Sequence, residues 1–148
     1  MAIPYSFLIF LDFDGVLHRG TSGTFRKVPL LDSLLAANPR TGIVLTTNWR
    51  MSEDLDSLRA YFTNPVTASR IFDVVDDAPV TRHGQRQREI ESWLDTHRYY
   101  GQFVALDDSA SLFDTGWRHL VLTDAREGLT EGDIAEVAQR ICRAGACH

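Results

Sequence analysis

The sequence predicts an α/β domain: a three-layer sandwich in which a central parallel sheet of about five strands is covered by helices on both faces. Short apolar runs bounded by turn residues alternate along the chain with amphipathic stretches, which is the pattern of this class. The apolar runs are nearly unbroken, as expected for parallel strands that are buried on both faces. The 148 residues match the length of one domain, so we expect residues 1–148 to form a single domain.

Five apolar runs are the strand candidates. They are Phe7–Leu11, Ile43–Thr46, Ile71–Val75, Phe103–Leu106 and Leu120–Leu122. Parallel strands that are joined by helices bind their ligands beyond the carboxyl ends of the strands. The residues that follow each strand are therefore the first place to look for chemistry.

Four helices are expected between and after these strands. They are Leu30–Ala37, Glu53–Phe62, Arg86–His97 and a last helix that begins after Thr130. Pro29 is a favourable residue for opening the first helix. Ser52 is the expected N-cap of the second. Thr130 and Asp133 form a capping-box-like pair at the start of the last.

The composition is that of an ordinary globular protein, with 44% hydrophobic and 24% charged residues. The 15 basic and 20 acidic residues give a net charge of −5, so bulk charge does not support nucleic-acid binding, although a local basic patch is compatible with it. The early apolar run Phe7–Leu11 is far shorter than the ~20 residues that span a bilayer, and no basic segment precedes it. We expect a cytoplasmic protein without membrane contact, and nothing in the sequence indicates an oligomeric state.

The first strand ends in an acidic motif, Leu11-Asp12-Phe13-Asp14-Gly15. A carboxylate at the tip of a buried strand is costly unless a cation or hydrogen-bond donors face it. Side chains at positions i and i+2 of an extended segment point to the same side, so Asp12 and Asp14 are expected to converge. Gly15 then allows the backbone to leave sharply.

Polar residues also follow the second and fourth strands. Thr46-Thr47-Asn48-Trp49-Arg50 ends the second, and the acidic pair Asp107-Asp108 ends the fourth. Arg86 and Arg88 open the helix that leads into the fourth strand. Four carboxylates at one edge of a sheet repel one another without a divalent cation, and oxygen ligands favour a hard ion, with Mg²⁺ the first choice.

With these motifs the sequence resembles the haloacid dehalogenase (HAD) superfamily of phosphotransferases. The resemblance rests on Asp-x-Asp-Gly-x-Leu from Asp12 to Leu17, on the threonines that end the second strand, on a basic residue and on Asp107-Asp108, in the order of the family. It implies a Rossmann-like fold. It also implies an enzyme, a Mg²⁺-dependent hydrolase of phosphomonoesters that acts through an aspartyl-phosphate.

The resemblance implies roles for the four carboxylates. Asp12 would be the nucleophile, and Asp14 would protonate the leaving oxygen and later deprotonate the attacking water. The Mg²⁺ ligands would be Asp12, the backbone carbonyl of Asp14, and Asp107. Asp108 belongs to the same metal site, where it would orient metal-bound water or the basic residue.

Two of the implied roles have two candidates each. Thr46 or Thr47 would hold a phosphoryl oxygen; we favour Thr46 because it directly follows the apolar run, and a slip of one residue reverses the face. Arg86 or Arg88 would neutralise charge on the transferring group. The two arginines lie about 200° apart around a helix, so only one can face the site, and we favour Arg86 because it opens the helix.

Other residues beside these motifs are expected to contact substrate. Gly15 and Asn48 flank the acidic motif and the threonines. Arg50 follows the second motif, and His18 and Arg19 come just after the first.

The segments that could hold a cap domain are short. Family members that act on small metabolites carry one between the first two motifs or before the basic residue; here Val16–Arg40 holds one short helix and one loop, and Asp76–Gln85 has ten residues. Without a cap, the resemblance implies an open site and a phosphorylated substrate as large as a nucleic-acid end or a phosphoprotein. The loop from His18 to Lys27 is expected to form a β-hairpin flap that brings Arg19, Arg26 and Lys27 near this anion.

Three alternatives stay open. The combination of motifs is also similar to small bacterial HAD-type domains associated with RNA repair proteins, which implies a phosphatase that processes RNA or DNA ends. A catalytically silent HAD-like module that only binds phosphate is the second alternative. The third is a phosphorylated receiver module, although a receiver carries its phosphoacceptor on the third strand, which here ends in Val75-Asp76.

Overall fold

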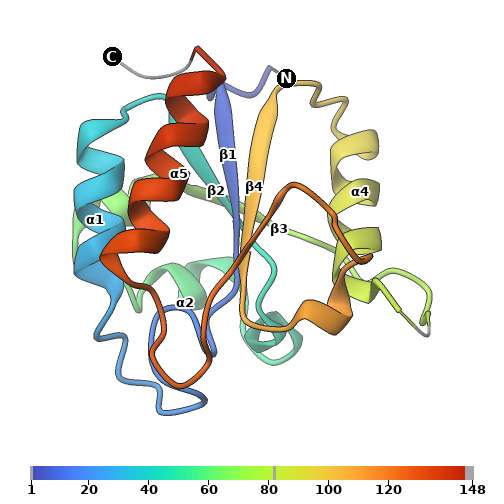
Figure 1. The fold of residues 1–148 in the computed structure, drawn as a ribbon, viewed down its shortest axis with the longest axis horizontal. Coiled ribbons are helices and arrows are strands. Elements are labelled where there is room, and N and C mark those ends of the chain that lie inside the picture. Colours follow the sequence, from blue (N-terminus) through green and yellow to red (C-terminus); the bar gives the residue numbers. More distant parts are fainter. Residues whose placement is uncertain (1, 82, 146–148) are drawn as a thin grey trace.

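The computed structural model describes residues 2–81 and 83–145, which form one parallel sheet with helices on both faces (Figure 1). The strands are β1 (Phe7–Leu11), β2 (Thr41–Leu45), β3 (Ile71–Val74), β4 (Gln102–Asp107) and β5 (Leu120–Leu122), in the spatial order β3-β2-β1-β4-β5. The helices are α1 (Val28–Ala37), α2 (Leu55–Arg59), α3 (Pro65–Arg70), α4 (Gln85–Thr96) and α5 (Glu131–Arg143), with 3₁₀ turns η1 (Asn48–Met51) and η2 (Ala110–Leu112). The predicted α/β class and the parallel sheet of five strands are confirmed, and the described residues form no cap domain.

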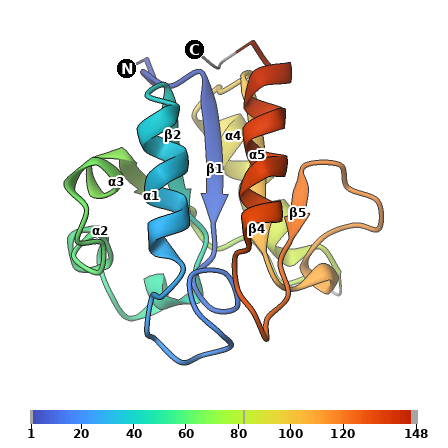
Figure 2. The same ribbon diagram turned by 60° about the vertical axis from the view of Figure 1, so that its left-hand side comes forward.

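Two apolar cores lie on the two faces of the sheet. Helices α1 and α5 pack together on one face, and α4 covers the other, as Figures 1 and 2 show. Alternate residues of β1 divide between the two cores: Phe7, Ile9 and Leu11 face the α1–α5 side, whereas Leu8 and Phe10 face α4. β1 therefore needs an apolar residue at every position, which explains its unbroken apolar run.

The register of the sheet brings three strand ends to one level. Leu11 at the end of β1 is paired with Leu45 of β2 and with Leu106 of β4. The residues that follow these three leucines are Asp12, Thr46 and Asp107, and they therefore lie at the same edge of the sheet.

The last helix is capped as expected, whereas the region of α2 and α3 differs from the prediction. Thr130 and Asp133 form a full capping box on α5. Ser52 is not the N-cap of α2: the helix begins later, and the Asp54 carboxylate accepts a hydrogen bond from the Ser57 N–H at 2.8 Å. The short helix α3 was not predicted, although Asn64 caps it and Pro65 opens it, because six residues are too few for a clear apolar period.

The segment from His18 to Lys27 contains no strand, so the predicted β-hairpin flap is wrong. The segment is a loop of successive turns, in which Gly20 and Gly23 adopt positive φ angles. None of the helices within the described residues combines the length and the apolar character that crossing a bilayer requires.

Candidate active site

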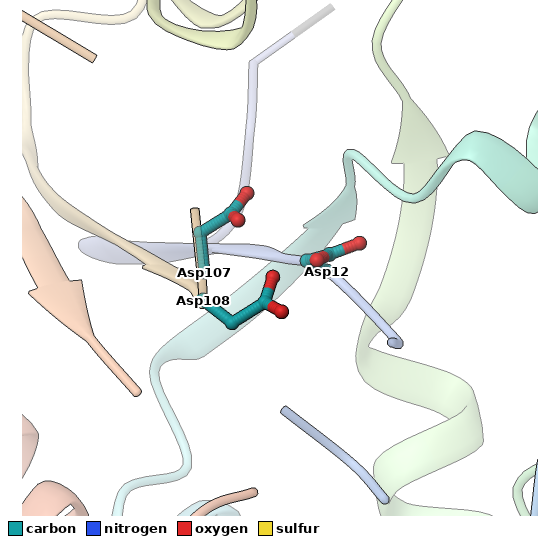
Figure 3. Close-up of side chains that lie close together, drawn as sticks. All are labelled: Asp12, Asp107 and Asp108. Atoms are coloured by element: carbon teal, nitrogen blue, oxygen red, sulfur yellow. The ribbon is translucent and has the colours of Figure 1, made fainter. Parts of the chain in front are cut away.

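Three carboxylates meet at the carboxyl edge of the sheet. Asp12 follows β1, Asp107 ends β4 and Asp108 comes next; one oxygen from each lies within 4.8 Å of the other two. Figure 3 shows the three side chains lying close together. Asp12 is 6% exposed and Asp107 1% exposed, so two of the three are buried.

Arg86 lies between the two buried carboxylates. It is the second residue of α4, which begins after Gly84, a residue with a φ of 72°. Its Nη1 is 2.8 Å from Asp107 Oδ2 and 3.2 Å from Asp12 Oδ1, and its Nη2 donates to Asn48 Oδ1 at 2.9 Å. Asp12 and Asp107 both lie on the α4 face of the sheet by the strand alternation, so this helix can deliver the cation to them.

Burial dominates the electrostatics of this group. It raises the pKa of Asp12 to about 8, and the charge of Asp107 adds to the effect while Arg86 opposes it. Burial also raises the pKa of Asp107 despite its contact with Arg86. For Arg86, burial lowers the pKa, but Asp107 and Asp12 outweigh it, so the guanidinium stays charged.

The donor set fits a hard divalent cation. One arginine does not suffice to keep both buried carboxylates ionised near neutral pH, as the raised pKa values show. A cavity of about 240 Å³ opens beside them, lined also by Asp14, Asn48 and Ser109. Carboxylate oxygens in this arrangement are the ligands that Mg²⁺ prefers, so the residues present fit that ion.

We expect the thermal stability of the metal-free protein to fall as the pH rises from 6 to 8, and Mg²⁺ to reverse the loss. Asp12 has a folded pKa of about 8 against 3.8 as its ordinary value, so the folded state holds a proton that the unfolded state has lost within this range. Saturating Mg²⁺ should raise Tm by about 5 °C at pH 8 and by less at pH 6. Differential scanning calorimetry checks this, with Asp12→Asn as the variant that flattens the pH dependence; equal shifts at both pH values would contradict it.

Asp14 is held by two side chains, one from His18 four residues further on and one from Trp49, which is 35 positions away. Asp14 Oδ1 is 2.7 Å from His18 Nε2, and Trp49 Nε1 donates to Asp14 Oδ2 at 3.2 Å. His18 is fully buried, whereas the side chain of Asp14 is 35% exposed and lines the cavity beside Asp12. The carboxyl group is thus fixed in orientation while it keeps access to the cavity.

Gly15 is required by a close approach. Its φ is 74°, and a Cβ built on it would lie 2.1 Å from Asp108 Oδ2. Thr123 supports the same turn, since its hydroxyl donates to the Gly15 carbonyl at 2.7 Å. Glycine at this position lets the acidic motif lie directly against Asp108.

Thr46 and Thr47 are both buried but differ in environment. Thr46 donates its N–H to the Leu11 carbonyl at 2.9 Å, and it follows Val44, which faces α4, by two residues. The strand alternation continued by one step therefore directs Thr46 to the face of Asp12. Thr47 Oγ1 accepts from the Trp49 N–H at 3.2 Å and caps the 3₁₀ turn η1.

Two of the predicted arginines lie away from the cavity. The Arg50 guanidinium donates to the Thr46 and Thr47 carbonyls and to Glu89 at 2.9 Å, so its donors hold the end of β2 against α4. Arg88 points to the outer side of α4, where it pairs with Asp114 at 3.1 Å. Neither guanidinium lines the cavity beside Asp12, so neither is placed to contact a phosphate there.

The three remaining predicted substrate contacts are His18, Arg19 and Asn48, and each lies in a different environment. His18 contacts Asp14 but does not itself line the cavity beside Asp12. Arg19 lines a second cavity next to His18. Asn48 is exposed, lines the cavity beside Asp12 and accepts a hydrogen bond from Arg86.

Trp49 contacts the candidate site in a way that the sequence did not reveal. Its indole lies 35 positions from Asp14 in the chain, and η1 brings the two together. A tryptophan beside a strand end is most simply interpreted as packing. Its ring does pack against Phe13 and Phe25, with centroid distances of 5.4 and 5.5 Å.

Comparison with protein families gives one match: a model described as "HAD domain in Swiss Army Knife RNA repair proteins" matches residues 8–134. Comparison with curated proteins and with solved structures gave no significant match. The matched residues reach from β1 into α5 and include every residue of the site described above.

Proposed function

Because the chain belongs to the family of HAD domains in Swiss Army Knife RNA repair proteins, we propose that it is a Mg²⁺-dependent phosphomonoester hydrolase that acts through an aspartyl-phosphate. The observation that carries this proposal is the juxtaposition of Asp12, Asp107 and Asp108 beside Arg86, with Asp14 held at the same cavity. The proposed nucleophile Asp12, the proposed proton donor Asp14 and the positively charged Arg86 all line one cavity.

In the first half of the reaction, a carboxylate oxygen of Asp12 attacks phosphorus. The bond from phosphorus to the ester oxygen breaks, and Asp14 gives its proton to that oxygen, so the alcohol leaves neutral. Arg86 balances the negative charge of the transferring group, and Thr46 would hold one of its oxygens by a hydrogen bond. When bound by Asp12, Asp107 and the Asp14 carbonyl, with Asp108 alongside, Mg²⁺ supplies the positive charge that lets an anionic carboxylate approach an anionic phosphate.

In the second half, Asp14 acts as the base. It takes a proton from water, whose oxygen attacks phosphorus, and the bond between phosphorus and Asp12 breaks. Inorganic phosphate leaves, and Asp12 returns as a carboxylate while Asp14 is again protonated. The hydrogen bonds to His18 and Trp49 keep Asp14 in place for both proton transfers.

A generic aryl phosphate tests the proposal. The protein should hydrolyse p-nitrophenyl phosphate when Mg²⁺ is present and lose this activity when EDTA removes it. Mg²⁺ binding without turnover would indicate instead a silent module that binds phosphate.

We expect Trp49→Phe to slow the cleavage of alkyl phosphates more than the cleavage of aryl phosphates. The substitution keeps a ring among Phe13 and Phe25 but removes the donor to Asp14. A poor leaving group needs the proton of Asp14, whereas a nitrophenolate leaves without it. The value of kcat/KM should fall about 10-fold for an alkyl phosphate and stay within about twofold for p-nitrophenyl phosphate.

The two substrates also distinguish positioning from general damage. A structural defect at Trp49 would lower kcat/KM equally for both. Tyr61→Phe is the matched control, because Tyr61 packs on Trp49 with a centroid distance of 5.2 Å and its hydroxyl binds Glu53, not Asp14.

A further inference from the structure

A second cavity, of about 390 Å³, lies next to the catalytic one. Its lining is basic and hydroxylic: His18, Arg19, Ser22, Thr24, Arg26 and Lys27. His18 belongs to this wall, and its Nε2 touches Asp14, which lines the catalytic cavity. One hydrogen-bonded pair therefore separates the two spaces.

The cations of this second cavity are unpaired. Within the described part of the chain, Arg19, Arg26 and Lys27 make no ion pair with a carboxylate, unlike Arg50 and Arg88. In a chain of net charge −5, three such cations on one wall form a local positive site. Arginine and lysine beside hydroxyl groups are the groups that bind phosphate.

The loop that carries these cations is held in shape. Gly20 donates its N–H to the Ala125 carbonyl at 2.7 Å, and Lys27 donates to the Leu17 carbonyl at 2.9 Å. Figures 1 and 2 both show this loop beside the one that leads into α5, at the carboxyl edge of the sheet. These hydrogen bonds hold the loop that lines the cavity at both of its ends.

Phe25 adopts a strained backbone conformation in this loop. Its φ is 53°, a conformation that costs a non-glycine residue about 1–3 kcal/mol, and its ring packs against Phe13, Trp49 and Tyr61. These ring contacts offset the strain. Arg26, the next residue, lines the cavity.

We propose that this cavity is a subsite for the phosphodiester next to the terminal phosphate of a nucleic-acid strand. The inference rests on the proposed function, since it takes the terminal phosphate to be the one at Asp12. A nucleic acid presents phosphates at short, regular intervals, so a second phosphate is always available beside the first. The 39% exposed ring of Tyr61, stacked on Phe25 at 5.1 Å, adds an aromatic face of the kind on which bases stack.

The test compares substrates with and without the second phosphate. Wild-type kcat/KM should be at least about 10-fold higher for dinucleotides with a terminal 5′- or 3′-phosphate than for the corresponding mononucleotides and for p-nitrophenyl phosphate. Arg19→Gln/Arg26→Gln should reduce this preference about 10-fold and lower the dependence of KM on salt. Arg40→Gln, an exposed arginine just before β2 at the opposite edge, should retain it.

Three outcomes would overturn the subsite. They are a wild type without the preference, a double variant that loses rate equally on every substrate, and an equal preference for a phosphopeptide with acidic neighbours. Fluorescence anisotropy with an oligonucleotide that has no terminal phosphate, measured without Mg²⁺, reports on the cavity apart from catalysis. Binding that the double variant weakens, in a protein that hydrolyses nothing, would retain the subsite and reject the proposed function.

Discussion

Asp12→Asn should lower kcat for p-nitrophenyl phosphate by at least about 10³-fold at saturating Mg²⁺. The amide oxygen is a poor nucleophile. Asp12 is contacted by Arg86, and it lines the same cavity as Asp14, the proposed proton donor. Steady-state hydrolysis at pH 7 measures the loss.

The same variant should stay folded, so the loss is chemical. Its Tm should lie within a few degrees of the wild-type value, since burial already keeps Asp12 largely protonated in the metal-free protein near neutral pH. Asp56→Asn makes the same chemical change at a side chain that is 92% exposed on α2, and it should retain full activity. Activity of Asp12→Asn near that of Asp56→Asn would assign the nucleophile elsewhere.

The strand ends could be predicted from the sequence because a strand that is buried on both faces has an easily recognised apolar pattern. A strand that is covered on both faces is apolar throughout, so the first polar residue marks its end, as at Asp12 and Asp107. Parallel pairing then places those ends at one edge, whatever the lengths of the connections. Helical geometry predicts that only one of Arg86 and Arg88 can face the cavity, and Arg86 is favoured because it opens the helix.

Contacts that depend on the exact path of a loop could not be predicted. The indole of Trp49 reaches Asp14 only because η1 turns the chain after Thr47. Arg50 resembled a phosphate ligand by its place in the chain, yet Glu89, which is 39 positions away, takes its guanidinium. The sequence predicted Arg19 and Arg26 on a hairpin flap near the anionic substrate, whereas the folded loop has no strand and places both residues in the wall of a second cavity.

Removal of the buried cation should have the largest effect on stability. Arg86→Met leaves Asp12 and Asp107 facing each other without compensation, and such a change costs about 3–5 kcal/mol. The cost should be greater at pH 8 than at pH 6, because Asp12, whose pKa burial raises to about 8, is ionised to a larger extent at the higher pH. Urea unfolding at the two pH values measures the difference.

Arg86→Lys separates charge from geometry at the same position. Lysine restores a cation, so most of the stability at pH 8 should return. It cannot span the two carboxylates and Asn48 as the guanidinium does, so kcat should remain about 10-fold or more below the wild-type value. If Arg86→Met were as stable as the wild type at pH 8 without metal, Arg86 would not be the cation that compensates the negative charge of Asp12 and Asp107.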